Sequence, residues 1–241
     1  MIKRKLAKAI ILSSLAVSVP VLAGGIKGEA ELGFVSTTGN TETETINAKL
    51  QLNKETEYWA HEANFGVLSN SQEDQDTGQD ETTAEKYTAS FKSDRKLDDR
   101  SYLYGLATYE DDRFSGFDYQ ATAGVGYGYK IINNDERKLA VEIGPGYRIN
   151  AVEDGDDEKE VTLRLGETYD WKFSPTGEFN QFLNVEGGED NTITRFGVGV
   201  KAALNTSLAL KVGTVYKYTE EVPADKDHAD TETSATITYS F

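Results

Sequence analysis

Long stretches in which apolar and polar side chains alternate strictly constrain the fold of this chain more than any other feature. Between Ser115 and Lys130, alternate positions are aromatic or aliphatic, and the positions between them carry polar side chains or glycine. The two sets are Phe117, Tyr119, Ala121, Ala123, Val125, Tyr127 and Tyr129, and Asp118, Gln120, Thr122, Gly124, Gly126 and Gly128. Successive side chains of a strand point to opposite faces, so this pattern predicts a strand with one face suited to lipid and the other to water.

The same alternation recurs along the chain with turn residues between the segments, whereas no stretch after Ala23 shows a sustained helical period. Twelve strands are predicted, starting near Lys27, Thr41, Glu57, Ala84, Ser101, Gly116, Arg137, Glu160, Glu178, Thr192, Ser207 and Thr231. An even count returns the C-terminus to the side where the N-terminus began, as single-chain bacterial barrels require. The predicted fold is an all-β, antiparallel up-and-down transmembrane barrel of about 12 strands, with 10 or 14 as alternatives.

A soluble sandwich or lipocalin-like barrel would also alternate, but it would bury its apolar face inside. A closed soluble barrel of this size has no reason to gather glycines and charges on the face opposite its apolar band. The mean hydropathy of −0.53 does not argue against a membrane barrel, because such a barrel shows lipid only every second residue. The sequence contains no cysteine, so the sheet itself has to provide the stability.

The N-terminus has the pattern of a cleaved secretory signal. Four basic residues in the first eight precede an apolar run, and Val21-Leu22-Ala23 places small or β-branched residues at the cleavage position. The run is too short for a spanning helix. Residues 1–23 are therefore predicted to be a signal peptide and residues 24–241 an outer-membrane barrel. Removal of residues 1–23 leaves 21 of the 25 basic residues and all 41 acidic residues. The resulting net charge of −20 makes nucleic acid a poor partner.

Connections between the predicted strands alternate between short and long. The long ones, Ser69 to Thr83, Ala151 to Lys159 and Glu220 to Asp230, are acidic. Short periplasmic turns and longer external loops are typical of outer-membrane barrels, so these loops are predicted to lie outside the cell. No cofactor is expected. Weak binding of Ca²⁺ or Mg²⁺, which would link the loops to lipopolysaccharide phosphates, is an alternative to simple solvation because carboxylates are oxygen ligands.

Two further features concern the barrel's ends and interior. Tyr239 and Phe241 end the chain in phase with the apolar face and resemble the signal read by the barrel-assembly machinery, an expected partner during biogenesis. Aromatic residues near strand ends predict two girdles. The predicted lumen-facing charges are Asp118, Glu142, Arg148, Arg164, Asp170, Arg195 and Lys201, with Lys49, Lys172, Lys211 and Lys217. A hairpin register that pairs Tyr129 with Arg137 would place Asp118 opposite Arg148.

Two segments of the chain carry a resemblance to a known family. The first contains Gly39, Asn40 and Thr41, and the second runs from Tyr109 through Asp112, Arg113, Phe114, Ser115 and Gly116 into the glycine-rich strand. Both resemble the salt-induced outer-membrane protein family, a bacterial barrel domain of unknown function. The resemblance implies the fold and the outer membrane, and brings no catalytic residue. Physically, Gly39-Asn40 is a tight-turn pair, and Asp111-Asp112-Arg113 is a charged loop that can pair internally.

Catalytic signals are weak. Gly124-x-Gly126-x-Gly128 lies inside an alternating strand and opens no helix, so it fails the context of a nucleotide loop. These glycines more plausibly make room for long side chains opposite. His61 and His228 lack the His, Ser and orienting residue of an outer-membrane lipid hydrolase. The favoured function is a non-enzymatic barrel, structural or a narrow passive channel; the alternatives are a surface interaction protein binding cations, lipopolysaccharide or a partner, and, remotely, a lipid or peptide hydrolase.

Overall fold

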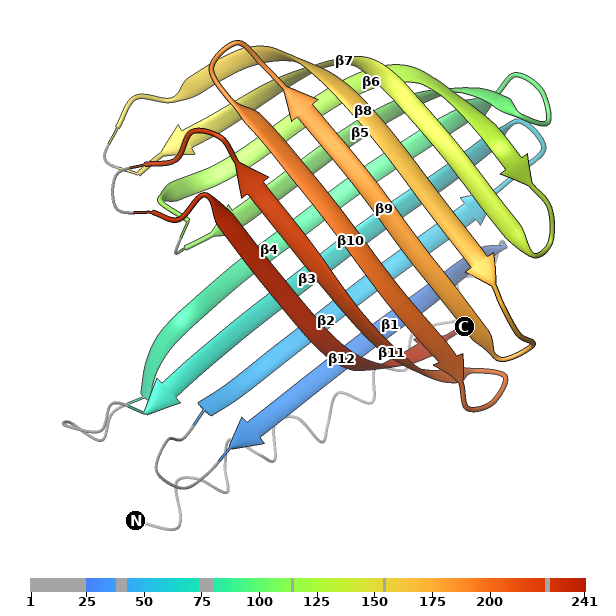
Figure 1. Ribbon diagram of the computed structural model, residues 1–241, viewed down its shortest axis with the longest axis horizontal. Coiled ribbons are helices and arrows are strands. Elements are labelled where there is room, and N and C mark those ends of the chain that lie inside the picture. The colour runs from blue at the N-terminus through green and yellow to red at the C-terminus, as the bar shows by residue number, and fades with distance from the viewer. Residues whose placement is uncertain (1–24, 38–42, 74–79, 114, 154, 224–225) are drawn as a thin grey trace.

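The protein is a closed barrel of twelve antiparallel strands, in which each strand pairs with its neighbours in sequence and β1 pairs with β12. The computed structural model describes residues 25–37, 43–73, 80–113, 115–153, 155–223 and 226–241. Figure 1 shows the strands crossing the wall at a steep tilt, with opposite slopes on the near and far sides. The predicted signal peptide, residues 1–23, lies outside the described residues and stays a prediction.

The strand count and the strand positions confirm the predicted fold. Each strand begins within four residues of its predicted start. The strands are β1 (Ile26–Thr37), β2 (Thr43–Glu55), β3 (Trp59–Glu73), β4 (Asp80–Lys96), β5 (Ser101–Asp112), β6 (Phe117–Asn133), β7 (Arg137–Val152), β8 (Glu158–Lys172), β9 (Gly177–Gly187), β10 (Thr192–Ala203), β11 (Leu208–Thr219) and β12 (Ala229–Ser240).

The seam between the first and last strands is the shortest pairing in the barrel. Four residue pairs join β1 to β12, from Glu29 with Ser240 to Leu32 with Ile237, whereas twelve join β1 to β2. The backbones of Gly28 and Phe241 extend the seam by two hydrogen bonds of 2.9 Å. The seam therefore closes near the end where both termini lie, which is the periplasmic end of a single-chain barrel.

The connections at the periplasmic end are short, as predicted, but the acidic external loops are shorter than expected. β3 ends at Glu73 and β4 begins at Asp80. In the same way, β7 ends at Val152 and β8 begins at Glu158. Much of the predicted loop sequence therefore continues the ladders beyond the membrane band. Alternation need not persist there, because both faces of such an extension meet water.

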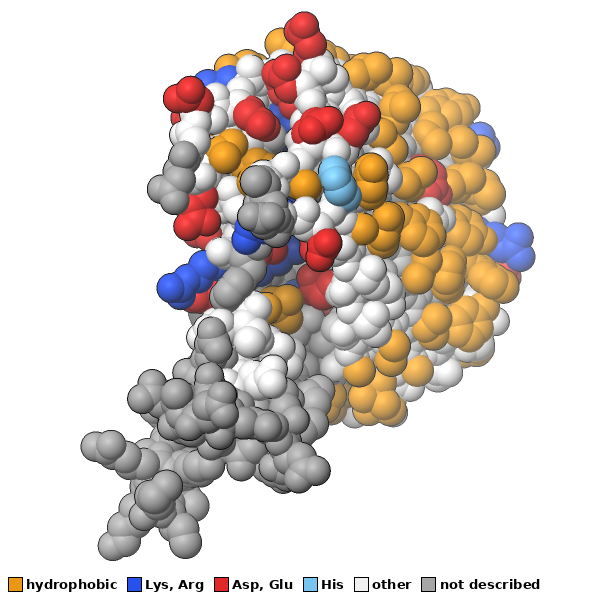
Figure 2. Space-filling model, turned by 60° about the vertical axis from the view of Figure 1, so that its left-hand side comes forward, with side chains coloured by type: hydrophobic (Ala, Val, Ile, Leu, Met, Phe, Trp, Pro, Cys, Tyr) orange, Lys and Arg blue, Asp and Glu red, His pale blue; other side chains and the backbone are white. Residues whose placement is uncertain are grey.

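The outward face of the barrel is apolar and exposed. Large outward side chains include Phe65, Leu103, Val125, Ile143, Val161, Leu163, Phe196, Val212 and Ile237. Figure 2 shows these hydrophobic side chains covering the wall, while acidic side chains gather at the end that carries the external loops. None of the described residues forms a helix long and apolar enough to cross a bilayer.

The inner face combines charged side chains with glycines that make room for aromatic rings. Tyr104 lies over Gly126 and Tyr102 over Gly128, so closely that a Cβ on either glycine would come within 2.6 Å of the ring. Tyr102 is buried and faces the lumen, so the prediction that aromatic residues near strand ends form the girdles is wrong for this residue. The predicted role of the glycine-rich strand as a seat for large side chains is consistent with this packing.

The β6–β7 register differs from the predicted one at the turn and again at a bulge near the start of β6. Asn133 pairs with Lys138, so the turn is tighter and lies further along the chain than predicted. Tyr129 pairs with Val141, not with Arg137, and Thr122 is the residue opposite Arg148. Between Phe117 and Tyr119 the ladder shifts by one residue, leaving Asp118 as the extra, exposed residue. The bulge also buries Phe117, which had been predicted to face lipid. An inserted residue moves every side chain beyond it to the other face.

Candidate functional site

The lumen holds the densest group of charged side chains, beginning with a buried cluster under the external loops. Arg148 of β7 is 1% exposed. Its guanidinium donates to the carboxylate of Glu160 on β8, to the backbone oxygen of Asn191 at 2.5 Å and to that of Glu186 at 3.2 Å. The Glu186 carboxylate lies 4.0 Å away. One cation therefore faces two carboxylates and two backbone oxygens, while its buried Nε has no hydrogen-bond partner among the described residues.

A second cluster crosses the barrel between opposite walls. Lys217 of β11 donates to Glu110 of β5 at 2.5 Å and to Gln120 of β6 at 2.8 Å. Arg195 of β10 and Lys86 of β4 approach the same Glu110 carboxylate at 3.6 and 4.0 Å. Because β5 and β11 are six strands apart in a ring of twelve, the Glu110–Lys217 contact bridges the full width of the lumen.

Around this bridge lies a cavity of about 180 Å³ whose lining carries excess positive charge. Its charged lining residues are Lys49, Lys86, Arg195, Lys217, Glu110 and Glu232. Glu232 of β12 lies 3.8 Å from Lys49 and 3.7 Å from Lys86. Four cations against two anions give a formal charge of +2. This volume is called the cationic chamber below.

A third cluster fills the lumen toward the periplasmic side. Glu142 of β7 accepts a hydrogen bond from Arg164 of β8 at 2.7 Å and from the Tyr102 hydroxyl at 2.8 Å, and it pairs with Lys92 of β4. Arg164 also donates to Asn184 of β9 at 2.5 Å. The Glu142 carboxylate on β7 thus contacts side chains from β4, β5 and β8.

The periplasmic end opens into a polar vestibule of about 660 Å³. Lys201 donates to Glu29 at 3.0 Å and lies 3.5 Å from Glu178, and Lys211 donates to Glu31 at 2.6 Å. The charged side chains that line the vestibule are Lys27, Lys201, Lys211, Glu29, Asp170 and Glu178. Three cations and three anions balance, in contrast to the cationic chamber.

The structure brings most of the predicted lumen residues together. Glu142, Arg148 and Arg164 lie in the clusters described above, Arg195 in the cationic chamber, and Asp170 and Lys201 in the vestibule. Asp118 is the exception because of the bulge. Glu110, Glu160 and Glu186 were not among the predicted lumen residues. The in-phase positions of Glu160 and Glu186 on their strands could have revealed them, whereas Glu110 directly precedes the predicted charged loop.

The family-like segment from Tyr109 to Gly116 spans the end of β5 and the turn that follows. Tyr109 stacks on Tyr119 with ring centres 5.7 Å apart, and Arg113 donates to Glu85 of β4 at 3.0 Å. Arg113 therefore pairs with the neighbouring strand β4. Ser115 donates to the backbone oxygen of Asp112 at 2.7 Å, and Gly116 has a φ of +82°, which favours glycine. Gly39, Asn40, Thr41 and Phe114 lie outside the described residues.

The two histidines have no catalytic surroundings in the described part of the chain. His61 faces lipid across from Ser93, but its ring stacks between Trp59 and Phe91. Its Nδ1 has no hydrogen-bond partner among the described residues, so nothing there orients it as a base. His228 shares a 3.0 Å hydrogen bond with the backbone oxygen of Thr219.

Metal binding by the acidic loops stays a prediction, since Asp74 and Asp76 lie outside the described residues. Among the residues that are described, no group of three His, Cys, Asp or Glu side chains is placed to hold a metal ion. At the chain end, Tyr239 and Phe241 stack with ring centres 6.1 Å apart, and the Phe241 ring packs on Gly28 of β1. Their role in assembly remains untested.

Known proteins share this architecture. The barrel is similar to the NanC porin, with a TM-score of 0.53 at 11% identity over 90% of this chain and 99% of the porin. It is equally similar to an outer-membrane channel from Pseudomonas putida F1, with a TM-score of 0.53 at 11% identity over 90% of this chain and 96% of the channel. These likenesses show the fold, a β-barrel of the outer-membrane type.

In sequence, the chain is 26% identical over 216 residues to the uncharacterized protein YdiY of Escherichia coli K12, covering 89% of this chain and 83% of YdiY. Residues 30–241 match the family of proteins of unknown function called DUF481, which is nearly all of the predicted mature chain. The protein is therefore an outer-membrane β-barrel that belongs to the DUF481 family.

Proposed function

We propose that this protein is a non-enzymatic, narrow passive channel that lets small anionic solutes and ions cross the outer membrane. The observation that carries the proposal is the charge of the lumen: a cationic chamber, with four cations against two anions, stands above a wide, charge-balanced vestibule. The similarity to a porin and to an outer-membrane channel supports a channel as the general class of function.

The constriction is made by side chains and can open without breaking the sheet. Lys217, Glu110 and Arg195 meet through long side chains, and none of these contacts belongs to the β-ladder. Rotation of the Lys217 side chain would break the contact between opposite walls while every strand pair remains intact. Side-chain bridges of this kind allow brief openings of a narrow pore.

The sign of the chamber predicts the selectivity. Rings of basic side chains in a pore favour anions, since they replace part of the hydration that the ion loses on entry. The vestibule, with three cations against three anions, is expected to discriminate little. Selection is therefore expected at the chamber, between the Arg148 cluster and the Glu142 cluster.

Conductance across planar bilayers, with a potassium chloride gradient, tests the proposal. Wild-type protein is expected to conduct with a reversal potential that shows preference for chloride. Lys86→Gln should reduce the preference about thirtyfold, because one unit charge at about 4 Å contributes roughly 1 kcal/mol in a water-like medium, with opposite sign for chloride and for potassium. Lys201→Gln, in the vestibule, is the matched control and should change it little. A folded protein that never conducts would overturn the proposal.

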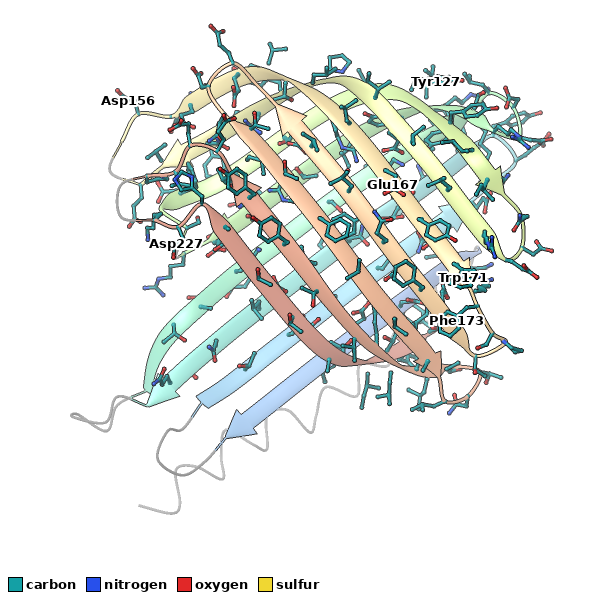
Figure 3. The ribbon with its side chains drawn as sticks, in the orientation of Figure 1. Tyr127, Asp156, Glu167, Trp171, Phe173 and Asp227 are labelled. Atoms are coloured by element: carbon teal, nitrogen blue, oxygen red, sulfur yellow. The ribbon has the colours of Figure 1, made fainter. Side chains whose placement is uncertain are left out.

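Surface interaction through the external loops is the second candidate. Figure 3 shows Asp156 and Asp227 on loops that project from the external end, and Figure 2 shows acidic side chains gathered there. Such loops would attract Ca²⁺ or Mg²⁺ and, through them, lipopolysaccharide phosphates. Calcium titration of the folded barrel, compared with Asp156→Asn/Asp157→Asn, tests this: saturable binding weakened in the variant supports it, and no binding excludes it. The link to salt conditions suggested by the sequence resemblance remains a prediction.

A further inference from the structure

One carboxylate faces lipid in the middle of an apolar wall. Glu167 of β8 shares the outward face with Leu165 and Tyr169, and its cross-strand neighbours are Val141 of β7 and Leu183 of β9. Figure 3 shows Glu167 on the wall, well away from the external loop that carries Asp156. Glu167 lies four positions before Trp171, which places it about 10 Å inside the aromatic girdle for a strand tilted by about 40°.

Charged outward side chains elsewhere on the described strands lie toward the strand ends. Those near the periplasmic turns are Lys54, Arg95 and Arg137, and those near the external loops are Glu85, Asp111 and Lys159. Ends of this kind reach the headgroup region, where charges are solvated. Glu167 is therefore the exception within the apolar band of the described strands.

A single neighbour partly satisfies this carboxylate. The Gln181 side chain of β9 donates its amide to Glu167 Oε2 at 2.6 Å. An amide has two N–H donors and an acceptor oxygen, and a carboxyl group can take part in several hydrogen bonds. Glu167 and Gln181 thus form a polar unit with donor and acceptor capacity left over, in a region where lipid chains offer neither.

We propose that the outward surface around Glu167 and Gln181, on β8 and β9, is the interface with a second copy of this barrel. A two-fold axis places the same patch on both partners. The remaining N–H of Gln181 in each copy would then donate to the free Glu167 oxygen of the other, so that one donor and one acceptor per copy match. The proposal is independent of channel activity.

The chemistry favours a second copy over a lipid. At this depth a lipid chain presents ester oxygens at most, and these accept hydrogen bonds but donate none, whereas Glu167 needs donors. Lipid amines and hydroxyls lie at the membrane surface. The surrounding wall of Val141, Leu165 and Leu183 is aliphatic, which suits close contact between two barrels through dispersion.

Cysteine cross-linking in intact outer membranes tests the interface, because the native chain contains no cysteine. Leu183→Cys places a thiol beside Glu167, and Phe65→Cys places one on β3, in the opposite wall; both native side chains are exposed. A short bismaleimide is expected to give dimers with Leu183→Cys and few with Phe65→Cys. Equal yields at the two positions, or no dimer at either, would overturn the proposal.

A second set of variants shows whether the polar pair holds the interface. Adding Glu167→Leu and Gln181→Leu to Leu183→Cys should lower the dimer yield roughly tenfold. The two substitutions remove both symmetry-related hydrogen bonds between the copies, each expected to be about as strong as a hydrogen bond between transmembrane helices. Thr214→Val/Thr233→Val is the matched control, because it removes another outward pair, joined at 3.0 Å on β11 and β12, and should leave the yield unchanged. Heat modifiability shows that each variant is folded. An undiminished yield without Glu167 and Gln181 would contradict the proposal.

Discussion

The external half of the lumen and the vestibule contain the same types of charged residue. They differ in how many strands lie between the two partners of each ion pair. In the external half, Glu110 and Lys217 join walls six strands apart, and Arg148 is almost completely buried. In the vestibule, Lys211 reaches only from β11 to β1, and Lys201 from β10 to β1. The ion pair between opposite walls closes the external half of the lumen. The vestibule stays open because its ion pairs join strands on one side of the barrel.

Because of this difference, charged side chains in the external half are expected to affect the stability of the barrel more than those in the vestibule. Buried charges in the external half depend on each other, since an unpaired ion there has little water to replace its partner. Vestibule ion pairs are partly exposed and behave like surface pairs. The same substitution is therefore expected to have unequal consequences in the two halves.

The largest difference is expected when one cation is removed from each half. Arg148→Met leaves Glu160 and Glu186 without their shared partner and should lower the free energy of unfolding by roughly 3–5 kcal/mol. Lys201→Met should cost about 1 kcal/mol or less. Urea unfolding of both variants in lipid vesicles measures the two losses. Similar losses would show that the external half is as well hydrated as the vestibule.

Glu110→Gln should sharpen the charge difference between the halves. It keeps the shape of the side chain and raises the formal charge of the chamber from +2 to +3. The preference for chloride over potassium should rise about thirtyfold, because a unit charge at about 4 Å contributes roughly 1 kcal/mol in water-like surroundings, with opposite sign for the two ions. Reversal potentials measure this, with Glu178→Gln in the vestibule as control. An unchanged preference would place the selective region elsewhere.

A smaller, kinetic difference is expected in the access of water. Asn180→Cys, in the vestibule lining, should react with a charged methanethiosulfonate reagent roughly tenfold faster than Gln120→Cys beside the Glu110–Lys217 bridge, because the reagent requires a hydrated thiolate. The native chain has no competing cysteine. Equal rates at the two positions would mean that the bridge is open most of the time.

Alternation in the sequence was sufficient to predict the fold because the wall is repetitive. Every spanning segment must hide its apolar face from water, so the strand count and the strand starts follow from local pattern alone. Residues such as Arg148 and Arg164 could be assigned to the interior in the same way, since each lies in phase with lumen glycines. Local pattern carries this information because a strand repeats every two residues.

Partnership across the lumen could not be predicted. Glu110 and Lys217 are separated by 107 positions, and the sequence around each residue does not indicate its partner. The β6–β7 register could not be predicted either. Asn133 and Lys138 form a tighter turn than the pattern indicates, two bulges shift the ladder further, and the sequence around Asp118 alternates without interruption through one of them. Loop ends failed for a related reason, because the ladders continue beyond the membrane, where alternation is no longer enforced.

The smallest expected effect concerns the turns that close the vestibule end. In three of them an Asp or Asn side chain caps the following strand: Asp98 Oδ1 accepts hydrogen bonds from the backbone N–H groups of Arg100 and Ser101 at 2.7 and 2.8 Å, and Asn134 and Asn205 act in the same way. These bonds, that of Arg100 first, lower the pKa of Asp98 below its usual 3.8, whereas the two asparagines do not titrate.

A carboxylate whose pKa is lowered on folding contributes its stability above the unfolded pKa and loses it as the pH falls through the folded pKa. The urea midpoint of wild type should therefore fall slightly relative to Asp98→Asn when the pH is taken from 6 to about 3. Asp135→Asn, in the turn that Asn134 caps, is the matched control for a change of charge at this end. Parallel pH profiles for wild type and Asp98→Asn would show that the Asp98 turn, fully exposed to water, contributes nothing measurable to the closure of the barrel.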